Sequence, residues 1–561
     1  MSRHLICTLG KMDIPMIQKQ PYFKVDLFQS NILLIGSAGS GKSNFLKVLI
    51  AEIHNQLMSS SMKEQIYVLD SADSLKECQS LPFVCAHYDF SNEEYIKRVF
   101  YQIEKQYNEN VRALNGLQFS NDDVSSSIPH TTLIIDNINS FLDIKYNEKY
   151  FDILLRLARD GQTKGISLIV TGSSTRNITM ILGYFPQKIA LNLSSEEYLN
   201  VFSKKAISSR NIVGRGYGNV TFDASDKDRT YPLNLPYELQ IFHMDTSLSF
   251  EIEEKRCPRK LTRFTSVLKE SDYRQFISVS DPIEADDYET NKNDVVIGIE
   301  YTKCHAVVTH FATSRVMAIY GKRNEEKPLL WRRILKKFYE NQYEFILVDD
   351  GRTKLKELKE EMKISDINYF YKRIQFGHDG MEKFSFTVLL QFIDYIQENL
   401  MNIKGERRSF NTNQEVLSTV MPKEYYNAIS PNEGKTKKRC VFVLQSKEFF
   451  SNTVQANVFW GDIFPRLITY AEENDWYFFL TDTQRIPNVD LQNHFNQYIN
   501  TAILLDDIAE FVSDRGRRSV FGEMDLKELK EQYGLCEEND AYYYQLDTAE
   551  LLKIKCIRED G

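Results

Sequence analysis

The chain has no long apolar run, few cysteines for its length and no excess of basic residues. Its 561 residues include 8 cysteines, none in a C-x-x-C pair, which favours reduced thiols in a cytoplasmic protein and predicts no zinc site. No stretch approaches the ~18 apolar residues of a membrane-spanning helix, and residues 1–7 lack a signal-peptide pattern. The formal net charge is −9 and the pI about 5.7, which disfavours a broad electropositive surface, so no nucleic-acid partner is expected.

What the sequence does contain is a composition typical of a soluble globular protein. Hydrophobic residues make up 42% and charged residues 26% of the chain, which leaves enough apolar surface for sizeable cores. The length predicts more than one domain.

Residues 36–43 match the phosphate-loop pattern G-x-x-x-x-G-K-[ST]. An apolar run at 31–35 precedes them and predicts a buried strand, while 44–53 carries apolar residues at helical spacing. Glycines let backbone N–H groups curl towards phosphate oxygens, and the helix N-terminus adds partial positive charge. The alternative is a plain glycine turn. The predicted nucleotide-binding residues are Gly36, Ser37, Ala38, Gly39, Ser40, Gly41, Lys42 and Ser43.

The expected cofactors are ATP and Mg²⁺. Lys42 is predicted to reach the β- and γ-phosphates, and the Ser43 hydroxyl to coordinate Mg²⁺. The run 131–136 is largely apolar and ends in Asp136, the Walker B arrangement, in which the carboxylate holds the water shell of the metal.

Asn137 stands where most translocating ATPases of this architecture carry a glutamate. An amide can orient water but cannot accept its proton. This degenerate base position predicts a site that binds Mg-ATP well and hydrolyses it slowly, unless a partner supplies the missing group.

Further apolar runs alternate with amphipathic segments, so the predicted fold is α/β with a mostly parallel sheet of the RecA-like, P-loop kind. Residues 9–15 are expected to be a lead-in, 210–222 an edge hairpin, and 239–244 the strand that closes the sheet. The other expected strands are 21–27, 65–70, 166–171 and 188–193, and the expected helices are 92–112 and 150–159.

The pattern repeats in the second half, with its chemistry degraded. Gly321 and Lys327 keep phosphate-loop spacing, but Glu326 replaces the second glycine and Pro328 the metal-binding hydroxyl. Gln445 stands where Asp136 stands in the first copy. Glu325 and Glu326 would also place carboxylates beside the phosphate position, which is repulsive. The alternative is a forced alignment of generic strands.

These patterns predict three segments. Residues 1–245 form an ATPase domain with an intact Walker A loop, 246–293 a charged linker with at most short helices, and 294–561 a degenerate copy. The run Asp482-Thr-Gln-Arg-Ile-Pro487 takes a sensor-like position after the last matching strand.

The tandem layout resembles the FtsK/SpoIIIE superfamily, and within it the second and third ATPase domains of the type VII (ESX/WXG100) secretion motor, the EssC/EccC family. The resemblance rests on the lead-in 9–15, the loop 36–43, Ile135-Asp136-Asn137, Gly214-Arg215-Gly216 and the degenerate second copy. It implies that the chain is a fragment or a split-gene subunit of the motor. By residue, it matches Lys42, Ser43 and Asp136 to the nucleotide site.

The resemblance also implies partners and a location. These are WXG100-type secreted proteins, membrane components of the secretion system and a hexameric homo-oligomer at the inner face of the cell membrane. The last domain would recognise the secreted substrate. Arg159, Arg176 and Arg215 are candidate arginine fingers, and each can equally be a surface or ion-pair arginine. The competing functions are a DNA translocase and a nucleotide-binding pseudoenzyme scaffold.

Overall fold

The chain folds as two compact units, 1–263 with 278–280, and 264–277 with 281–561. The structure is a computed structural model, and each unit is described by itself. The described residues are all those outside 1–3, 59–62, 91, 120–127, 204–211, 222–230, 245–260, 262, 278–291, 312–313, 324, 351–354, 365–368, 372, 377–381, 387, 396–438, 452, 482–495, 513–519, 521–535 and 560–561.

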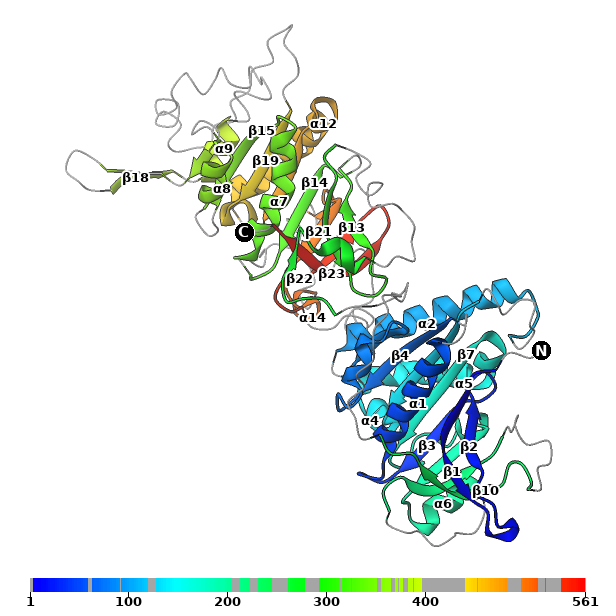
Figure 1. Cartoon of the computed structure of the whole chain (residues 1–561). Helices are drawn as coiled ribbons and strands as arrows, with labels where there is room; N and C mark the ends of the chain where they lie inside the picture. The colour runs from blue at the N-terminus through cyan, green and yellow to red at the C-terminus, as the bar shows by residue number, and fades with distance from the viewer. Residues whose placement is uncertain are drawn as a thin grey trace. The chain divides into compact units, whose positions relative to one another are not determined.

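The described part of the first unit contains one ten-stranded sheet (Figure 1), in the order β2-β1-β10-β9-β8-β3-β7-β6-β4-β5. The strands from β8 to β5 are parallel, and the other four extend the sheet by antiparallel pairing. The strands are β1 (Ile6–Asp13), β2 (Tyr22–Asp26), β3 (Ile32–Gly36), β4 (Glu64–Asp70), β5 (Val84–Tyr88), β6 (His130–Asp136), β7 (Ile166–Gly172), β8 (Gln187–Leu191), β9 (Arg215–Asn219) and β10 (Pro236–Ile241).

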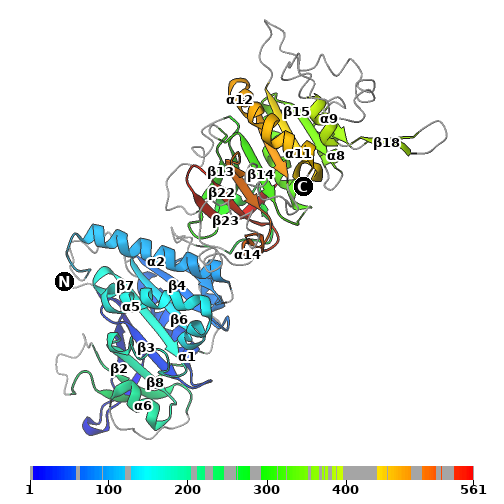
Figure 2. The same cartoon turned by 180° about the vertical axis from the view of Figure 1, so that it is seen from behind.

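Helices cover both faces of the parallel strands (Figure 2), which is why β3 and β6 are buried along their whole length. Because parallel crossovers are right-handed, the connection from β3 to β4 places α1 on one face. The connections from β5 to β6 and from β6 to β7 run across the sheet in the opposite direction, so they place α2 and α5 on the other face. The helices of this unit are α1 (Lys42–Met58), α2 (Glu93–Leu114), α4 (Ile138–Asp143), α5 (Phe151–Asp160) and α6 (Ser195–Phe202).

The predicted α/β fold with a mostly parallel sheet is confirmed, but its antiparallel side differs from expectation. The lead-in is itself a strand, β1, and the hairpin of β1 and β2 lies outside β10. Therefore the prediction that 239–244 closes the sheet is wrong, as is the assignment of 210–222 to an edge, since β9 lies between β8 and β10. The reason is that β1 supplies a backbone partner to β10, with Gly10 paired to Ile241.

The second unit repeats this topology strand for strand. In its described residues the sheet order is β13-β12-β23-β22-β21-β14-β20-β19-β15-β16, with β14 at the place of β3 and β19 at that of β6. The strands are β12 (Val295–Glu300), β13 (Ala306–Thr309), β14 (Val316–Tyr320), β15 (Glu344–Asp349), β16 (Tyr369–Tyr371), β19 (Cys440–Gln445), β20 (Tyr477–Thr481), β21 (Thr501–Leu504), β22 (Asp540–Gln545) and β23 (Glu550–Arg558).

The helix after β14 is α7 (Glu326–Glu340), the counterpart of α1. A separate hairpin of β17 (Arg373–Phe376) and β18 (Glu382–Phe386) pairs only within itself among the described strands. The remaining helices are α8 (Leu355–Glu361), α9 (Val388–Tyr395), α11 (Val454–Val458), α12 (Phe464–Asn474) and α14 (Ile508–Phe511).

Part of the predicted linker packs onto the second unit. Strand β11 (Leu268–Lys269) pairs with the end of β23, and the side chains of Leu268 and Tyr273 are buried. These two residues join a small apolar cluster with Val296 and Ile557. Burial of apolar side chains therefore packs this part of the predicted charged linker against the second unit. Most of the linker, 246–260 and 278–291, lies outside the described residues, and its bounds stay a prediction.

The sensor-like run 482–487 also lies outside the described residues. In the part of the chain that the structure describes, no helix is long and apolar enough to cross a membrane.

Candidate nucleotide site

The phosphate loop connects the central strand β3 to α1, and its glycines are needed for its shape. Gly39 and Gly41 have φ of +71° and +104°, the left-handed region that L-residues with a Cβ rarely adopt. A Cβ on Gly36 would stand 2.4 Å from Ser40 Oγ and 2.9 Å from the Leu191 carbonyl oxygen. The close approach of the chain thus excludes a side chain at Gly36, and the positive φ disfavours one at Gly39 and Gly41.

Lys42 is the first residue of α1, and its ammonium turns back into the loop. Its Nζ donates to the carbonyl oxygens of Gly36 at 2.8 Å and Ser37 at 3.0 Å. Burial lowers the pKa of Lys42, while the negative charge of Asp136 opposes this shift. The loop thus holds a half-buried cation close to the Walker B carboxylate. Ser43, the next residue of α1, is partly buried.

The loop also holds two hydroxyls that suit a phosphate ligand. Among the described residues, Ser37 Oγ and Ser40 Oγ are buried and have no hydrogen-bond partner. Buried polar atoms normally have partners, and an orphaned one costs about 1–3 kcal/mol. Phosphate oxygens could accept hydrogen bonds from both, so the residues present fit the triphosphate that the motif implies.

Asp136 ends β6, two strands from β3, and a hydroxyl from the intervening strand orients it. Thr171 Oγ1 on β7 donates to Asp136 Oδ1 and accepts the backbone N–H of Asn137 at 2.8 Å. Thr171 is fully buried. This positioning role was not predicted from the sequence, although a hydroxyl at the end of an apolar strand beside Walker B was a usable signal.

A second carboxylate lies level with Asp136 on the neighbouring strand. Asp70 is paired in register with Asp136, and the Ser74 hydroxyl lies 3.4 Å from a carboxylate oxygen of each. Burial raises the pKa of Asp136 and the charge of Asp70 adds to this rise, against the hydrogen bond from Thr171. The sequence marked Asp70 only as the end of a strand.

Asp70 itself is held as a carboxylate. Its oxygens accept backbone N–H groups from Ala72 at 3.0 Å and Leu75 at 2.8 Å, and His87 Nε2 lies 3.4 Å away. Burial acts to raise the pKa of Asp70, but these hydrogen bonds outweigh it and lower the pKa. The site therefore pairs Asp70, which resists protonation, with Asp136, which resists ionisation.

Asn137 caps the helix that follows it. Its φ is +70°, its Oδ1 accepts the Ser140 N–H at 3.4 Å and its Nδ2 lies 2.6 Å from Ser140 Oγ. Asparagine tolerates the left-handed region and is a preferred cap residue. A local structural reason thus exists for asparagine here, in addition to its predicted effect on hydrolysis.

The three candidate arginine fingers have different surroundings. Arg159 is exposed and bonded to the adjacent Asp160, and Arg176 is exposed. Arg215 forms an ion pair with Glu238 at 2.6 Å. Its neighbour Gly214 donates to the Ser40 carbonyl oxygen at 2.9 Å, so β9 begins directly beside the phosphate loop.

In the second unit the corresponding lysine keeps its position. Lys327 lies in the first turn of α7, is fully buried and donates from Nζ to the Gly321 carbonyl oxygen, as Lys42 does to Gly36. Pro328 follows it. Gln445 is paired in register with Asp349, as Asp136 is with Asp70.

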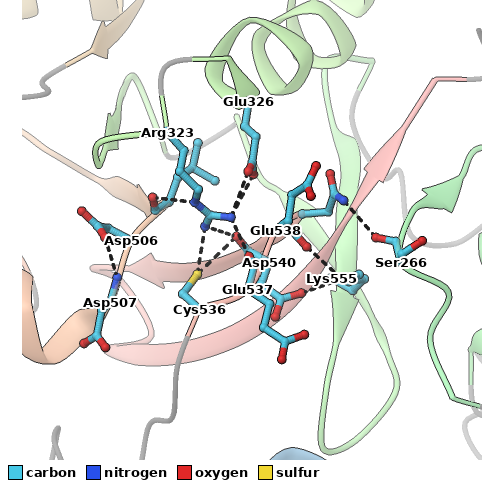
Figure 3. A network of polar contacts seen from close by, with 12 residues as sticks. Ser266, Arg323, Glu326, Asp506, Asp507, Cys536, Glu537, Glu538, Asp540 and Lys555 are labelled. Atoms are coloured by element: carbon cyan, nitrogen blue, oxygen red, sulfur yellow. Dashed lines mark hydrogen bonds and ion pairs between the residues drawn. The ribbon is translucent and has the colours of Figure 1, made fainter.

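The loop before α7 is occupied by its own side chains (Figure 3). Arg323 Nη1 donates to both carboxylate oxygens of Glu326, at 3.0 and 3.1 Å. The same guanidinium donates to the carbonyl oxygens of Leu505 at 2.9 Å and Asp540 at 2.7 Å. Burial raises the pKa of Glu326, and the charge of Arg323 opposes the rise. The guanidinium thereby ties the loop to β21 and β22.

The counterpart of Thr171 is also engaged differently. Thr481 ends β20 and accepts the indole N–H of Trp331 at 3.0 Å. Trp331 and Thr481 are both buried. The hydroxyl that orients Asp136 in the first unit here bonds an aromatic side chain of α7.

The chain is similar to known proteins in sequence and in fold. No protein-family model matches the chain. It is 26% identical over 243 residues to the type VII secretion system protein EssC of Staphylococcus aureus strain MRSA252, covering 41% of this chain and 16% of EssC. EssC of strain NCTC 8325 / PS 47 is 22% identical over 289 residues, covering 49% of this chain and 19% of EssC. The match thus spans less than a fifth of the length of these relatives.

Two solved structures share the fold across both units. EssC (ATPases 2 and 3) from Geobacillus thermodenitrificans has a TM-score of 0.58 and 14% identity, with 99% of this chain and 96% of that chain covered. Thermomonospora curvata EccC (ATPases 2 and 3), solved in complex with a signal sequence peptide, has a TM-score of 0.59 and 15% identity, with 99% and 93% covered. The chain is a homologue of the type VII secretion protein EssC and has the fold of the paired ATPase domains 2 and 3 of EssC and EccC.

Proposed function

We propose that the chain is the ATP-binding module of a type VII secretion motor, in which the first unit binds Mg-ATP and the second recognises the secreted substrate. The observation that carries the nucleotide site is the loop itself: the Lys42 ammonium turned back into the loop, and the orphaned hydroxyls of Ser37 and Ser40. Homology to EssC supports the secretion context.

The site residues would have separate roles. The loop N–H groups and Lys42 would hold the phosphates, and Ser43 with Asp136 would hold the Mg²⁺ shell. Thr171 keeps the Asp136 carboxylate in one orientation. The metal would neutralise charge on the phosphates.

We propose that hydrolysis is slow in the isolated chain. Asn137 cannot accept a proton, and its amide is bonded to Ser140. Binding of ATP would therefore serve assembly or conformational control, with a neighbouring subunit or partner supplying the missing group.

We propose that the second unit binds no nucleotide. The Glu326 carboxylate is already bonded to Arg323 in the corresponding loop, and Pro328 and Gln445 lack a hydroxyl and a carboxylate for the metal. Its fold would serve recognition of WXG100-type proteins. The peptide bound to the Thermomonospora EccC pair supports this role. A hexamer at the inner membrane face with the membrane components belongs to the same proposal.

Two measurements test this function on the full chain. Equilibrium binding of Mg-ATP should give one site per chain, and a stoichiometry of two or zero contradicts the assignment. Co-production with a tagged WXG100 protein should retain the chain, and removal of the C-terminal segment of that protein should abolish retention. ATP turnover stimulated by duplex DNA would instead indicate a translocase.

A further inference from the structure

Residues 212–214 form a short turn that packs directly on the phosphate loop. The Gly214 N–H donates to the Ser40 carbonyl oxygen at 2.9 Å, and the Gly214 carbonyl accepts the Ile241 N–H at 2.8 Å. Gln240 Nε2 also donates to the Val213 carbonyl oxygen at 3.3 Å. The turn is thus fixed between the loop and β10.

The side chain of Val213 lies beside the residue that precedes Lys42. A Cβ on Gly41 would be 3.1 Å from Gly214 N and 3.6 Å from Val213 Cγ1. Nevertheless Val213 is 65% exposed, and Ile212 is 45% exposed. Two apolar side chains therefore remain partly in solvent beside a polar loop, and that of Val213 lies next to the position that a side chain on Gly41 would take.

A second segment is fixed near the first turn of α1. Asn44 Nδ2 donates to the Phe242 carbonyl oxygen at 2.7 Å, and its Oδ1 accepts the Met244 N–H at 3.0 Å. The start of α1 is thereby tied to the chain that leaves β10. Both fixed segments belong to the β8–β10 side of the sheet.

The Walker B carboxylate and the hydroxyl that orients it lie on the opposite side of the loop from β8 to β10. In the sheet order β8-β3-β7-β6, the loop strand β3 has Thr171 and Asp136 on one side and β8 to β10 on the other. A triphosphate whose γ end lies towards Asp136 would place its nucleoside on the side of the loop away from β6. The turn at 212–214 lies on that side.

We propose that Val213, with Ile212, forms the apolar platform for the base of the bound nucleoside triphosphate. Base faces bind apolar and aromatic surfaces in concave sites next to a few polar groups. Neither side chain has a hydrogen-bonding group, so the platform favours a nucleotide over bare phosphate and does not separate adenine from guanine. This inference rests on the proposed function, because it needs a nucleotide at Lys42.

The test compares Mg-ATP with magnesium tripolyphosphate, which has the phosphates but no base, by calorimetry on the full chain. Val213→Asn places an uncharged polar group against the base and should weaken ATP binding about tenfold, or ~1.4 kcal/mol, while tripolyphosphate binding changes less than about twofold. Val213→Ala, which keeps the turn intact, should weaken ATP binding about threefold. Val111→Asn, the same exchange at an exposed position of α2, should change neither.

Four results would overturn the platform. Equal loss of both ligands in Val213→Asn and Val213→Ala means that the turn shapes the loop and does not contact the base. Unchanged ATP binding in both variants excludes the contact. Equal affinity of the wild type for ATP and tripolyphosphate means that the base contributes nothing to binding, although the phosphate site stands. Failure of the wild type to bind either ligand contradicts the proposed function as well as the platform.

Discussion

The hydroxyl of Thr171 donates to the carboxylate of Asp136 across two neighbouring parallel strands. It also accepts the N–H of Asn137, so one fully buried hydroxyl sets the backbone and the side chain of the Walker B segment. In the second unit the matching hydroxyl of Thr481 accepts from Trp331.

Replacing Thr171 with valine should weaken Mg-ATP binding. The change keeps the shape and removes one hydrogen bond to a charged group, which contributes about 1.5–3 kcal/mol, so the Kd should rise roughly tenfold or more. Thr481→Val is the matched control and should leave the Kd unchanged. Calorimetric titration measures both, and an unchanged Kd in Thr171→Val would show that Asp136 needs no such support.

Asp136→Asn should stabilise the ligand-free first unit near pH 7. Burial raises the pKa of Asp136, so its ionisation in the folded state is unfavourable, and the wild type loses stability as pH rises through the ordinary value of 3.8 and beyond. The advantage of the variant should shrink as pH falls towards 3.8, where the wild-type carboxyl is protonated. Thermal unfolding at a series of pH values checks this, and a variant less stable at pH 7 contradicts it.

The same Asp136→Asn variant should lose part of the Mg²⁺ dependence of ATP binding. The amide keeps an acceptor for Thr171 but carries no charge for the metal shell, to which Ser43 would still contribute. Titration with ATP in the presence and absence of Mg²⁺ should give a smaller difference in Kd for the variant than for the wild type, and an equal difference would contradict the role of Asp136.

Asn137→Asp should raise ATP turnover several-fold. Aspartate keeps the helix cap and tolerates the left-handed φ of +70°, and it adds a carboxylate that can accept a proton. Asn137→Ser keeps a cap without the carboxylate and should turn over ATP as the wild type does. Asn137→Glu suits this position less well and should cost about 1–2 kcal/mol of stability. If all three variants match the wild-type rate, the base position is not what limits hydrolysis.

Arg323→Ala should destabilise the second unit without changing nucleotide binding. It leaves the partly buried Glu326 carboxylate and the carbonyl oxygens of Leu505 and Asp540 without their donor, at a cost of about 2–4 kcal/mol. Lys322→Ala, which removes an exposed ion pair with Glu510, is the neighbouring control and should cost under ~1 kcal/mol. A gain of a second ATP site in Arg323→Ala would show that the guanidinium blocks a competent pocket.

The predicted loop and parallel strands match the structure because their evidence is local. The glycine spacing of 36–43 and the apolar runs around it depend on neighbouring residues alone. Strand β1 was missed because Gly10 and Lys11 interrupt its apolar pattern, and its pairing with β10 lies far along the chain. The role of Leu268 was missed for the same reason, since its partner on β23 is Ile557.

Some residues of the candidate site could likewise be predicted from the sequence, and others only from the fold. Lys42 and Asp136 are identifiable from motif and order. Thr171 had a weaker signal, a hydroxyl at the end of an apolar strand, whereas no spacing predicts the contacts of Ser74 and Val213. In the second unit the substitutions at 326, 328 and 445 were visible in the sequence. The bonding of Arg323 to Glu326 and Asp540 depends on folding.

The most direct measurement is thermal unfolding of the full chain with and without Mg-ATP, comparing Lys42→Met with Lys327→Met. At about a hundredfold above Kd, ATP should stabilise the first unit by roughly 2.7 kcal/mol in the wild type and in Lys327→Met, and should give no shift in Lys42→Met. A wild type without a shift, or a shift retained in Lys42→Met and lost in Lys327→Met, would contradict the assignment of the only proposed nucleotide site to the first unit.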